Sequence, residues 1–232
     1  MRWDKDQPLE ELRYERKFLV DELDSHHVRA LVKLHPMMFV QPYPPRYVNN
    51  IYLDSEDLVN YIENVDGVEK RRKVRLRWYG DLLGDSPKTM LEFKLRQGLM
   101  NRKIQVPLGG LRVDKTFNKQ VLEEFFGQNE LPLDISFGLH GLSPVLINRY
   151  CRWYFATPDG RFRVTVDTAL TYYNVRHLTN AFRYKFVDYK RIVVELKYQK
   201  EEDKTAERVA SYFPFRVTKN SKYVTGLESV FW

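Results

Sequence analysis

The sequence predicts an α+β protein made mainly of antiparallel strands, an eight-stranded tunnel barrel with several flanking helices. About eight segments have the β-branched and aromatic content of strands, at the spacing of an antiparallel barrel or sandwich. Several of them alternate charged and apolar residues, which places charges on one face of a strand and apolar side chains on the other. The clearest examples are Glu15-Arg16-Lys17, Arg75-Leu76-Arg77, Glu92-Phe93-Lys94, Arg161-Phe162-Arg163 and Glu195-Leu196-Lys197. Closed into a barrel, such strands would surround a charged interior suited to a chain of phosphates.

The expected strands alternate with short helices along the chain. Strands are expected at residues 12–20, 47–53, 70–79, 89–96, 101–106, 145–157, 161–170, 184–189 and 191–198. Helices are expected at residues 24–34, 55–63, 119–126 and 205–212, and residues 219–223 are expected to be helical or loop. Asp24 or Ser25 can cap the first helix, and Pro36 ends it. Pro158-Asp159-Gly160 predicts a hairpin turn.

Composition limits the class of protein. The 232 residues are 43% hydrophobic, enough for a core, and we expect one domain over residues 12–232 after a polar leader at residues 1–11. The net charge of +7 favours anionic partners. The single cysteine, Cys151, excludes an intrachain disulfide and fits a reducing cytoplasm. With no signal-peptide pattern and no run of ~18 apolar residues, we expect a soluble cytoplasmic protein that reaches a membrane only through a partner.

The alternating strands supply the candidate site residues. Arg75 and Arg77 share a face, and arginine binds phosphate oxygens through a planar fork that keeps its charge. A solvated basic strand is the alternative explanation. The same face of the expected strands carries Lys94, Lys103, Arg149, Arg163, Glu195 and Lys197. A glutamate among cations is either a salt-bridge partner or a ligand of a divalent metal, and both remain open for Glu195.

Several familiar catalytic motifs are absent from the sequence. There is no G-x-x-x-x-G-K-[ST] loop, no G-x-G-x-x-G, no Cys/His cluster and no G-x-S-x-G. Phosphoryl transfer needs none of these groups, because positioning and charge neutralisation do most of the work. The aromatic residues are expected to face the shell of the barrel rather than the basic face. We therefore expect no specific nucleic-acid site, only weak binding that depends on salt.

The order of the motifs resembles a known family. RYERKF, NNIYLDS, KVRLRWYG, LEFK, a lysine on the next strand, NRY, RFRVTVDT, VVELKY and KNSKY follow one another as in the vacuolar transporter chaperone (VTC) domain. That family lies within the triphosphate tunnel metalloenzymes, which are related to CYTH domains. The resemblance implies a tunnel that binds ATP and polyphosphate, and an enzyme that builds polyphosphate from the γ-phosphate of ATP with Mn²⁺ or Mg²⁺.

The resemblance also implies roles for individual residues. It places Arg75, Arg77, Lys94, Arg149 and Arg163 in catalysis, and Glu195 at the metal. It places phosphate contacts at Lys17, Lys103, Lys197, Lys219, Ser221 and Lys222, of which Lys219, Ser221 and Lys222 rest on the resemblance alone.

Two departures from the family pattern bear on the function. Arg13 stands where tunnel triphosphatases begin their E-x-E-x-K motif, which favours the polymerase branch. Ile147 stands where the family often has an aromatic residue before Asn-Arg. The sequence shows neither a membrane segment nor an SPX-like sensor domain, so a stand-alone, bacterial-type version is expected.

The leading hypothesis is therefore a polyphosphate polymerase that uses ATP. A tunnel triphosphatase that hydrolyses tripolyphosphate or nucleoside triphosphates would use the same pocket, with water as the acceptor. A polyphosphate-binding module without catalysis is the third possibility. The size of the products would separate these three.

Overall fold

The computed structural model describes residues 13–97, 100–176, 180, 182 and 184–231, and these residues form strands and helices in close to the expected order. The strands are β1 (Arg13–Val20), β2 (Arg46–Asp54), β3 (Lys70–Tyr79), β4 (Gly84–Ser86), β5 (Thr89–Gln97), β6 (Met100–Leu108), β7 (Leu111–Val113), β8 (Ser143–Ala156), β9 (Arg163–Asn174), β10 (Lys185–Asp188) and β11 (Ile192–Gln199). The helices are α1 (Ser25–Lys33), α2 (Val59–Val65), α3 (Lys119–Gly127), α4 (Leu133–Leu139), α5 (Asp203–Ser211) and α6 (Lys222–Phe231), with a 3₁₀ turn at Lys200–Glu202.

One large antiparallel sheet dominates the fold. Its strands follow the order β1-β11-β9-β8-β2-β3-β5-β6, and β10 adds to β9. These eight consecutive strands confirm the expected mainly antiparallel class. Within the described residues, however, no ladder joins β6 back to β1, so the expectation of a fully closed barrel is corrected to a curled, tunnel-like sheet.

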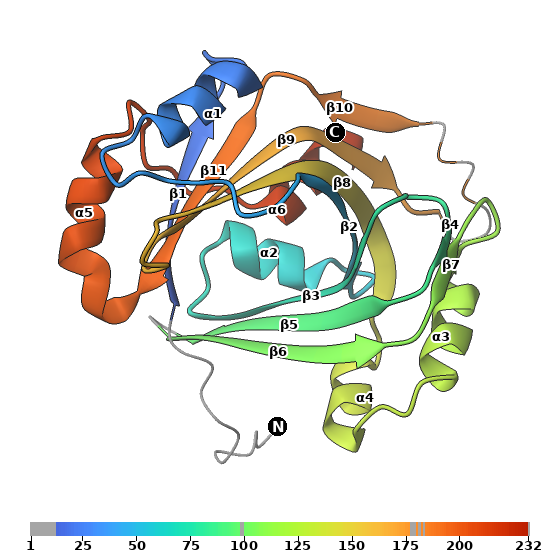
Figure 1. The fold of residues 1–232 in the computed structure, drawn as a ribbon. Helices are drawn as coiled ribbons and strands as arrows, with labels where there is room; N and C mark the ends of the chain where they lie inside the picture. The colour runs from blue at the N-terminus through green and yellow to red at the C-terminus, as the bar shows by residue number, and fades with distance from the viewer. Residues whose placement is uncertain (1–12, 98–99, 177–179, 181, 183, 232) are drawn as a thin grey trace.

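The curl brings the two ends of the sheet toward one another, and Figure 1 shows the strands arranged in a ring within which α2 and α6 are drawn. Lys17 on β1 and Lys73 on β3 are far apart in the strand order. Both nevertheless contact the segment before α6, since Lys17 Nζ donates to the Asn220 carbonyl at 3.2 Å and Lys73 Nζ contacts Ser221 Oγ at 2.8 Å. The inner face of the sheet therefore surrounds an interior that α6 enters.

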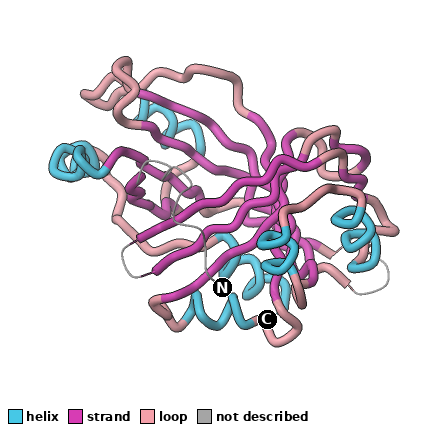
Figure 2. The backbone as a smooth tube through the Cα atoms, turned by 90° about the horizontal axis from the view of Figure 1, so that it is seen from below, coloured by secondary structure: helices cyan, strands magenta, loops and turns pink. Residues whose placement is uncertain are grey.

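The outer face of the sheet carries two apolar layers. Helices α1 and α5 cover β1, β11, β9 and β8 through a cluster that includes Phe18 and Val209. Helices α3 and α4 cover β3 and β5 through a cluster that includes Trp78 and Phe125. Figure 2 shows the helices placed around the strands in a second view. The apolar positions that alternate with the charges therefore face outward, as the strand pattern predicted.

Helix α6 fills part of the interior. Tyr223 stacks on Tyr52 of β2 with ring centroids 4.9 Å apart, and its hydroxyl donates to the buried Asp54 carboxylate. A Cβ added at Gly226 would lie 2.5 Å from the Tyr172 ring, so only glycine lets α6 approach β9 this closely. The sequence pattern had predicted helix or loop only at residues 219–223. The helix continues to Phe231, eight residues beyond that expectation.

Other differences from the expected elements are small. No strand was expected between residues 79 and 89, but β4 lies there and pairs with β7. Helix α4 was not predicted, and α2 begins at Val59 rather than near Ser55. The expected hairpin of β8 and β9 around Pro158-Asp159-Gly160 is confirmed. The predicted leader at residues 1–11 and the side chain of Arg13 lie outside the described residues.

Candidate functional site

The charged side chains of the strands meet on the inner face of the curled sheet. Residues directly opposite one another in an antiparallel pair share a face. Lys17, Glu195 and Thr165 form one such row across β1, β11 and β9. On the other side of the tunnel, rows run across β3, β5 and β6: Arg75, Glu92 and Gln105 in one, and Lys73, Lys94 and Lys103 in the next.

Glu195 is the centre of the first group of charges. Lys197 Nζ lies 2.9 Å from its Oε2, Arg152 lies 3.5 Å from the same oxygen, and Lys17 and Lys222 each lie 3.7 Å from Oε1. Burial alone would raise the pKa of Glu195, but the surrounding cations, led by Lys197, hold it well below the ordinary value. Glu195 is therefore an anion at neutral pH. Glu15 joins this group through Lys17, 2.9 Å away.

Glu92 organises the second group of charges from β5. Arg75 contacts its Oε2 through Nε at 2.7 Å, Lys103 lies 3.1 Å from Oε1, and Arg77 lies 3.6 Å from Oε1. Burial would raise the pKa of Glu92, but Arg75, then Arg77 and Lys103, outweigh burial and lower it strongly. One carboxylate thus holds three cations whose remaining N–H donors can face a ligand. Arg77 also donates through Nε to Asn50 Oδ1 at 2.9 Å, which fixes its position.

A buried ion pair joins β8, β9 and α6. Arg152 makes two contacts to Asp167, at 2.6 and 2.7 Å, and Lys222 Nζ lies 2.7 Å from Asp167 Oδ2. The carboxylate of Asp167 is fully buried. Burial lowers the pKa of Lys222, but Asp167 and Glu195 outweigh it and raise it well above the ordinary value. Lys222 therefore stays charged, and it ties the start of α6 to the inner face.

Lys73 differs from the other cations of the tunnel. The charges that act on it most strongly are all positive, and they come from Lys17, Lys94, Arg71 and Arg75. Burial and then these positive charges lower the pKa of Lys73 to about 7. Its Nζ contacts Ser221 Oγ at 2.8 Å, beside the first turn of α6. Lys73 can therefore change its charge near neutral pH.

The structure brings most of the sequence-predicted residues together. The inner-face groups include Lys17, Arg75, Arg77, Lys94, Lys103, Lys197, Ser221, Lys222 and Glu195. Arg163 stands opposite Lys197, so it shares the inner face, and its side chain is exposed. Lys219 is exposed in the segment before α6. Their roles in binding or catalysis remain predictions.

Arg149 is the exception, because the structure places it on the outer face. Its guanidinium carbon lies 4.0 Å above the ring of Tyr47. The inner arginine of β8 is Arg152, three residues later. Tyr150 stands two residues before Arg152, and the Arg152 guanidinium carbon lies 5.1 Å from the centre of its ring. The alternation of Trp153 and Phe155, which face the outer apolar layer, is the signal that could have identified Arg152.

Sequence reasoning also missed inner-face residues of other kinds. Lys73 continues the alternation of Arg75 and Arg77 by one step, so the pattern contained it. Aromatic residues were expected to face the shell, and Trp78 does so. That expectation is corrected for several tyrosines, since Tyr52 and Tyr150 pack with α6 on the inner face.

Comparisons with known proteins agree with this architecture. The sequence matches the family described as the VTC domain over residues 12–231. The chain belongs to the VTC domain family. It is 26% identical over 147 residues to vacuolar transporter chaperone complex subunit 4 of Schizosaccharomyces pombe, a match that covers 53% of this chain and 20% of the relative. The chain thus spans about a fifth of the length of that relative.

A solved structure supports the fold of this VTC domain. A protein described as a candidate adenylate cyclase from Vibrio parahaemolyticus superposes with a TM-score of 0.51. The likeness covers 93% of this chain and 98% of the other, at 12% sequence identity. At that identity the likeness shows a shared fold and nothing about activity.

The carboxylates of this VTC domain can be compared with what a divalent metal needs. In the described part of the chain, no three His, Cys, Asp or Glu side chains are arranged to hold a metal by themselves. Mg²⁺, however, is usually held by one or two carboxylates together with substrate phosphates and water. Glu195 and Glu15, which both contact Lys17, supply the two carboxylates that such a site needs. They fit a metal that is shared with phosphate, not a site made by protein alone.

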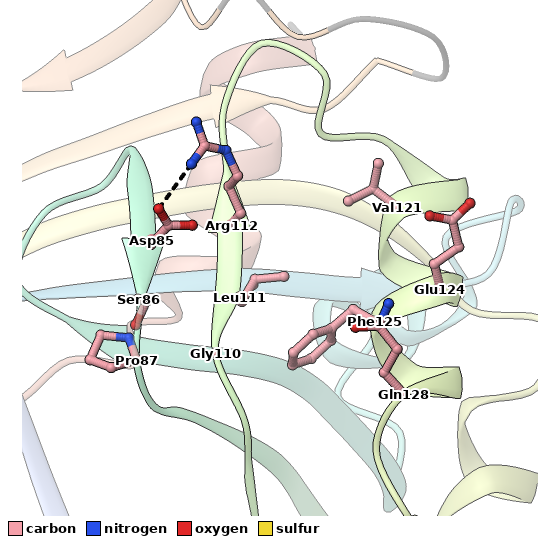
Figure 3. A pocket seen from close by; sticks show the side chains of 10 residues that line it. All are labelled: Asp85, Ser86, Pro87, Gly110, Leu111, Arg112, Val121, Glu124, Phe125 and Gln128. Atoms are coloured by element: carbon pink, nitrogen blue, oxygen red, sulfur yellow. Dashed lines mark hydrogen bonds and ion pairs between the residues drawn. The ribbon is translucent and has the colours of Figure 1, made fainter.

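A separate cleft of about 340 Å³ lies on the outside, between β4, β7 and α3 (Figure 3). Arg112 in this cleft is paired with Asp85 at 2.9 Å and with Asp114 at 2.8 Å. Arg112 is the one basic residue among the ten that line the cleft, whereas many cations gather in the tunnel, so we assign the site to the inner face. Among the described helices, none has both the length and the apolar character of a membrane span.

Proposed function

We propose that this VTC domain is a polyphosphate polymerase that transfers the γ-phosphate of ATP to a growing chain in its tunnel. The observation that carries the proposal is the inner-face array of cations, in which Glu92, Asp167 and Glu195 orient more bases than they can neutralise. Family membership and the relative named as a vacuolar transporter chaperone subunit support it. Because the relative is named as a subunit of a complex, we also propose that this domain works with a partner protein, and we expect that partner to lie at a membrane.

The proposed reaction needs positioning and charge neutralisation rather than a protein nucleophile. An oxygen of the chain-end phosphate attacks the γ-phosphorus, and the bond to the bridging oxygen of ADP breaks with its electron pair. No general base is required, because the attacking phosphate is already ionised. Arg75, Arg77 and Arg152 would stabilise the negative charge on the transferred group. Their contacts to Glu92 and Asp167 hold the guanidinium groups in place before the substrate arrives.

A metal bound to phosphate would add further charge neutralisation. Glu195 and Glu15 would hold Mn²⁺ or Mg²⁺, which polarises phosphate oxygens when it is bound. Lys17 and Lys197 lie between these carboxylates, and we expect them to move toward phosphate when the metal arrives.

The direct test is incubation of purified protein with ATP and Mn²⁺, with products separated by size on a gel stained for polyphosphate. We expect long chains together with ADP. Arg77→Ala should abolish the chains, whereas Arg112→Ala, beside the outer cleft, should leave them unchanged. Orthophosphate without chains would replace the proposal with a triphosphatase. Polyphosphate binding without turnover would reduce it to a binding module.

A further inference from the structure

Tyrosines and an arginine form the rim of the tunnel at one mouth. Tyr154 stands opposite Thr165, which stands opposite Glu195, so Tyr154 shares the inner face. Arg46 stands opposite Arg152 in the ladder of β2 and β8. Tyr79 continues the inner-face alternation of β3 beyond Arg77. All three residues therefore belong to the same face as the phosphate-directed cations.

Arg46 and Tyr79 are open to solvent and Tyr154 is half-buried, whereas residues deeper in the tunnel are buried. Tyr79 is 45% exposed, whereas Arg77, two residues further in, is 9% exposed. The Arg46 guanidinium carbon lies 4.0 Å from the Tyr79 ring centroid and 5.0 Å from that of Tyr154. Arg46 Nε also donates to the Tyr154 hydroxyl at 3.0 Å. Tyr43, 55% exposed, packs edge-on against Tyr154 with ring centroids 5.5 Å apart.

This arrangement orders the planar groups through contact with one another and still leaves much of Tyr79 exposed. Each planar group is held by another, so little side-chain freedom remains to be lost when a ligand stacks on the rim. Nucleobases stack on tyrosine rings and on arginine guanidinium planes. A single Arg–Tyr contact on a protein surface would not by itself indicate a ligand site. Here, however, the stacked group lies at the open end of a tunnel lined with cations.

We propose that Arg46, Tyr79 and Tyr154 form a base platform that stacks the purine of a nucleotide whose phosphates lie in the tunnel. This inference rests on the proposed function, because it assumes that a nucleoside triphosphate enters. Opposed residues in neighbouring strands are about 5 Å apart. A base on Arg46 therefore leaves its phosphates beside Arg152 and the Glu195 group. A purine offers more stacking surface than a pyrimidine, so the platform favours purines.

The platform has a consequence that the phosphate site alone does not have. Phosphate contacts treat ATP and inorganic tripolyphosphate alike, because both present the same charged chain. Contacts to the base act only on the nucleotide. Loss of the platform should therefore weaken ATP binding and leave tripolyphosphate binding intact.

The test is calorimetric binding of ATP and of tripolyphosphate, each in EDTA at one salt concentration, to matched variants. Tyr79→Leu and Tyr154→Leu keep an apolar side chain but remove the ring, and Tyr79→Phe and Tyr154→Phe keep the ring. Tyr189→Leu, at an exposed position far from the rim in sequence and 86% exposed, is the control. We expect each leucine variant to lose about tenfold in ATP affinity, the scale of one stacking contact. Tyr79→Phe and the control should match the wild type, and Tyr154→Phe, which keeps the ring but loses the hydroxyl that accepts from Arg46 Nε, should bind ATP more tightly than Tyr154→Leu.

The outcomes separate this inference from the function on which it rests. Tripolyphosphate affinity that stays within about twofold in the leucine variants, while ATP affinity falls, supports the platform. An equal loss for both ligands, or no loss for either, overturns the platform and leaves the tunnel function standing. A wild-type protein that binds neither ligand overturns the proposed function and the platform together.

Discussion

Lys73 is expected to take up a proton when a phosphate chain enters the tunnel. In the empty tunnel, burial and then Lys17, Lys94, Arg71 and Arg75 lower its pKa to about 7. A bound phosphate chain would offset these positive charges and pair directly with the ammonium group. Both changes favour the charged lysine, so binding should raise the pKa of Lys73 toward its ordinary range.

The size of the effect follows from the pKa. At pH 8, one unit above a pKa of about 7, roughly one Lys73 in ten carries a proton in the empty protein. If binding protonates the rest, nearly one proton is taken up for each chain bound. Because the bound form then holds more protons, affinity should fall as the pH rises above about 7. The affinity for the phosphate chain can fall by at most about tenfold for each pH unit through this one group.

The assay is calorimetry of tripolyphosphate binding at pH 8 in buffers that differ in ionisation enthalpy. The slope of the observed enthalpy against ionisation enthalpy gives the number of protons taken up. Lys73→Arg should retain affinity but lose most of the uptake, because arginine stays charged at all these pH values. Lys200→Arg, on the surface, is the control. Equal proton uptake by wild type and Lys73→Arg would refute the reasoning.

Three further predictions follow from the packing and the charges. Gly226→Ala should lower the free energy of unfolding by roughly 1–3 kcal/mol, because the alanine Cβ would lie 2.5 Å from the Tyr172 ring. An unchanged midpoint of urea unfolding would contradict this packing of α6. Arg149→Ala should leave the rate of polyphosphate synthesis within about twofold of wild type. Arg152→Lys cannot make both hydrogen bonds to Asp167, so it should reduce the rate about tenfold or more. A larger loss of polyphosphate chains in the gel assay with Arg149→Ala than with Arg152→Lys would show that Arg149 belongs to the site. Glu195→Gln should abolish metal-dependent synthesis. It should also increase tripolyphosphate affinity in EDTA, because it removes a negative charge among cations. Weaker tripolyphosphate binding in EDTA would show that this carboxylate serves only to hold the cations in place.

The strand pattern predicted much of the site because a period of two residues fixes which side chains share a face. Arg75 and Arg77, and Glu92 on the next strand, were found in this way, and their ladder confirms the placement on one face. At β8 the same rule places Arg149 and Arg152, three residues apart, on opposite faces, but it does not say which of the two faces inward. Only the apolar partners of the outer layer decide between them, and those are tertiary contacts.

The rest of the fold depends on interactions that a local pattern does not contain. Whether the sheet closes depends on how β1 meets β6, two segments distant in sequence. The position of α6 depends on the fit of Gly226 and Tyr223 against the inner wall. The pattern did not predict that Tyr52 and Tyr150 face inward, because aromatic residues fit either face of a strand and only tertiary packing decides which face they occupy.

The central claim is that phosphate lies on the inner face of the curled sheet. The most direct measurement is a crystal structure of the protein with tripolyphosphate, refined beside one of the ligand-free protein. We expect phosphate density that contacts Arg75, Arg77 and Arg152 between the Glu92 and Glu195 groups. Density confined to the outer face, whether beside Arg149 or in the cleft next to α3, would contradict it.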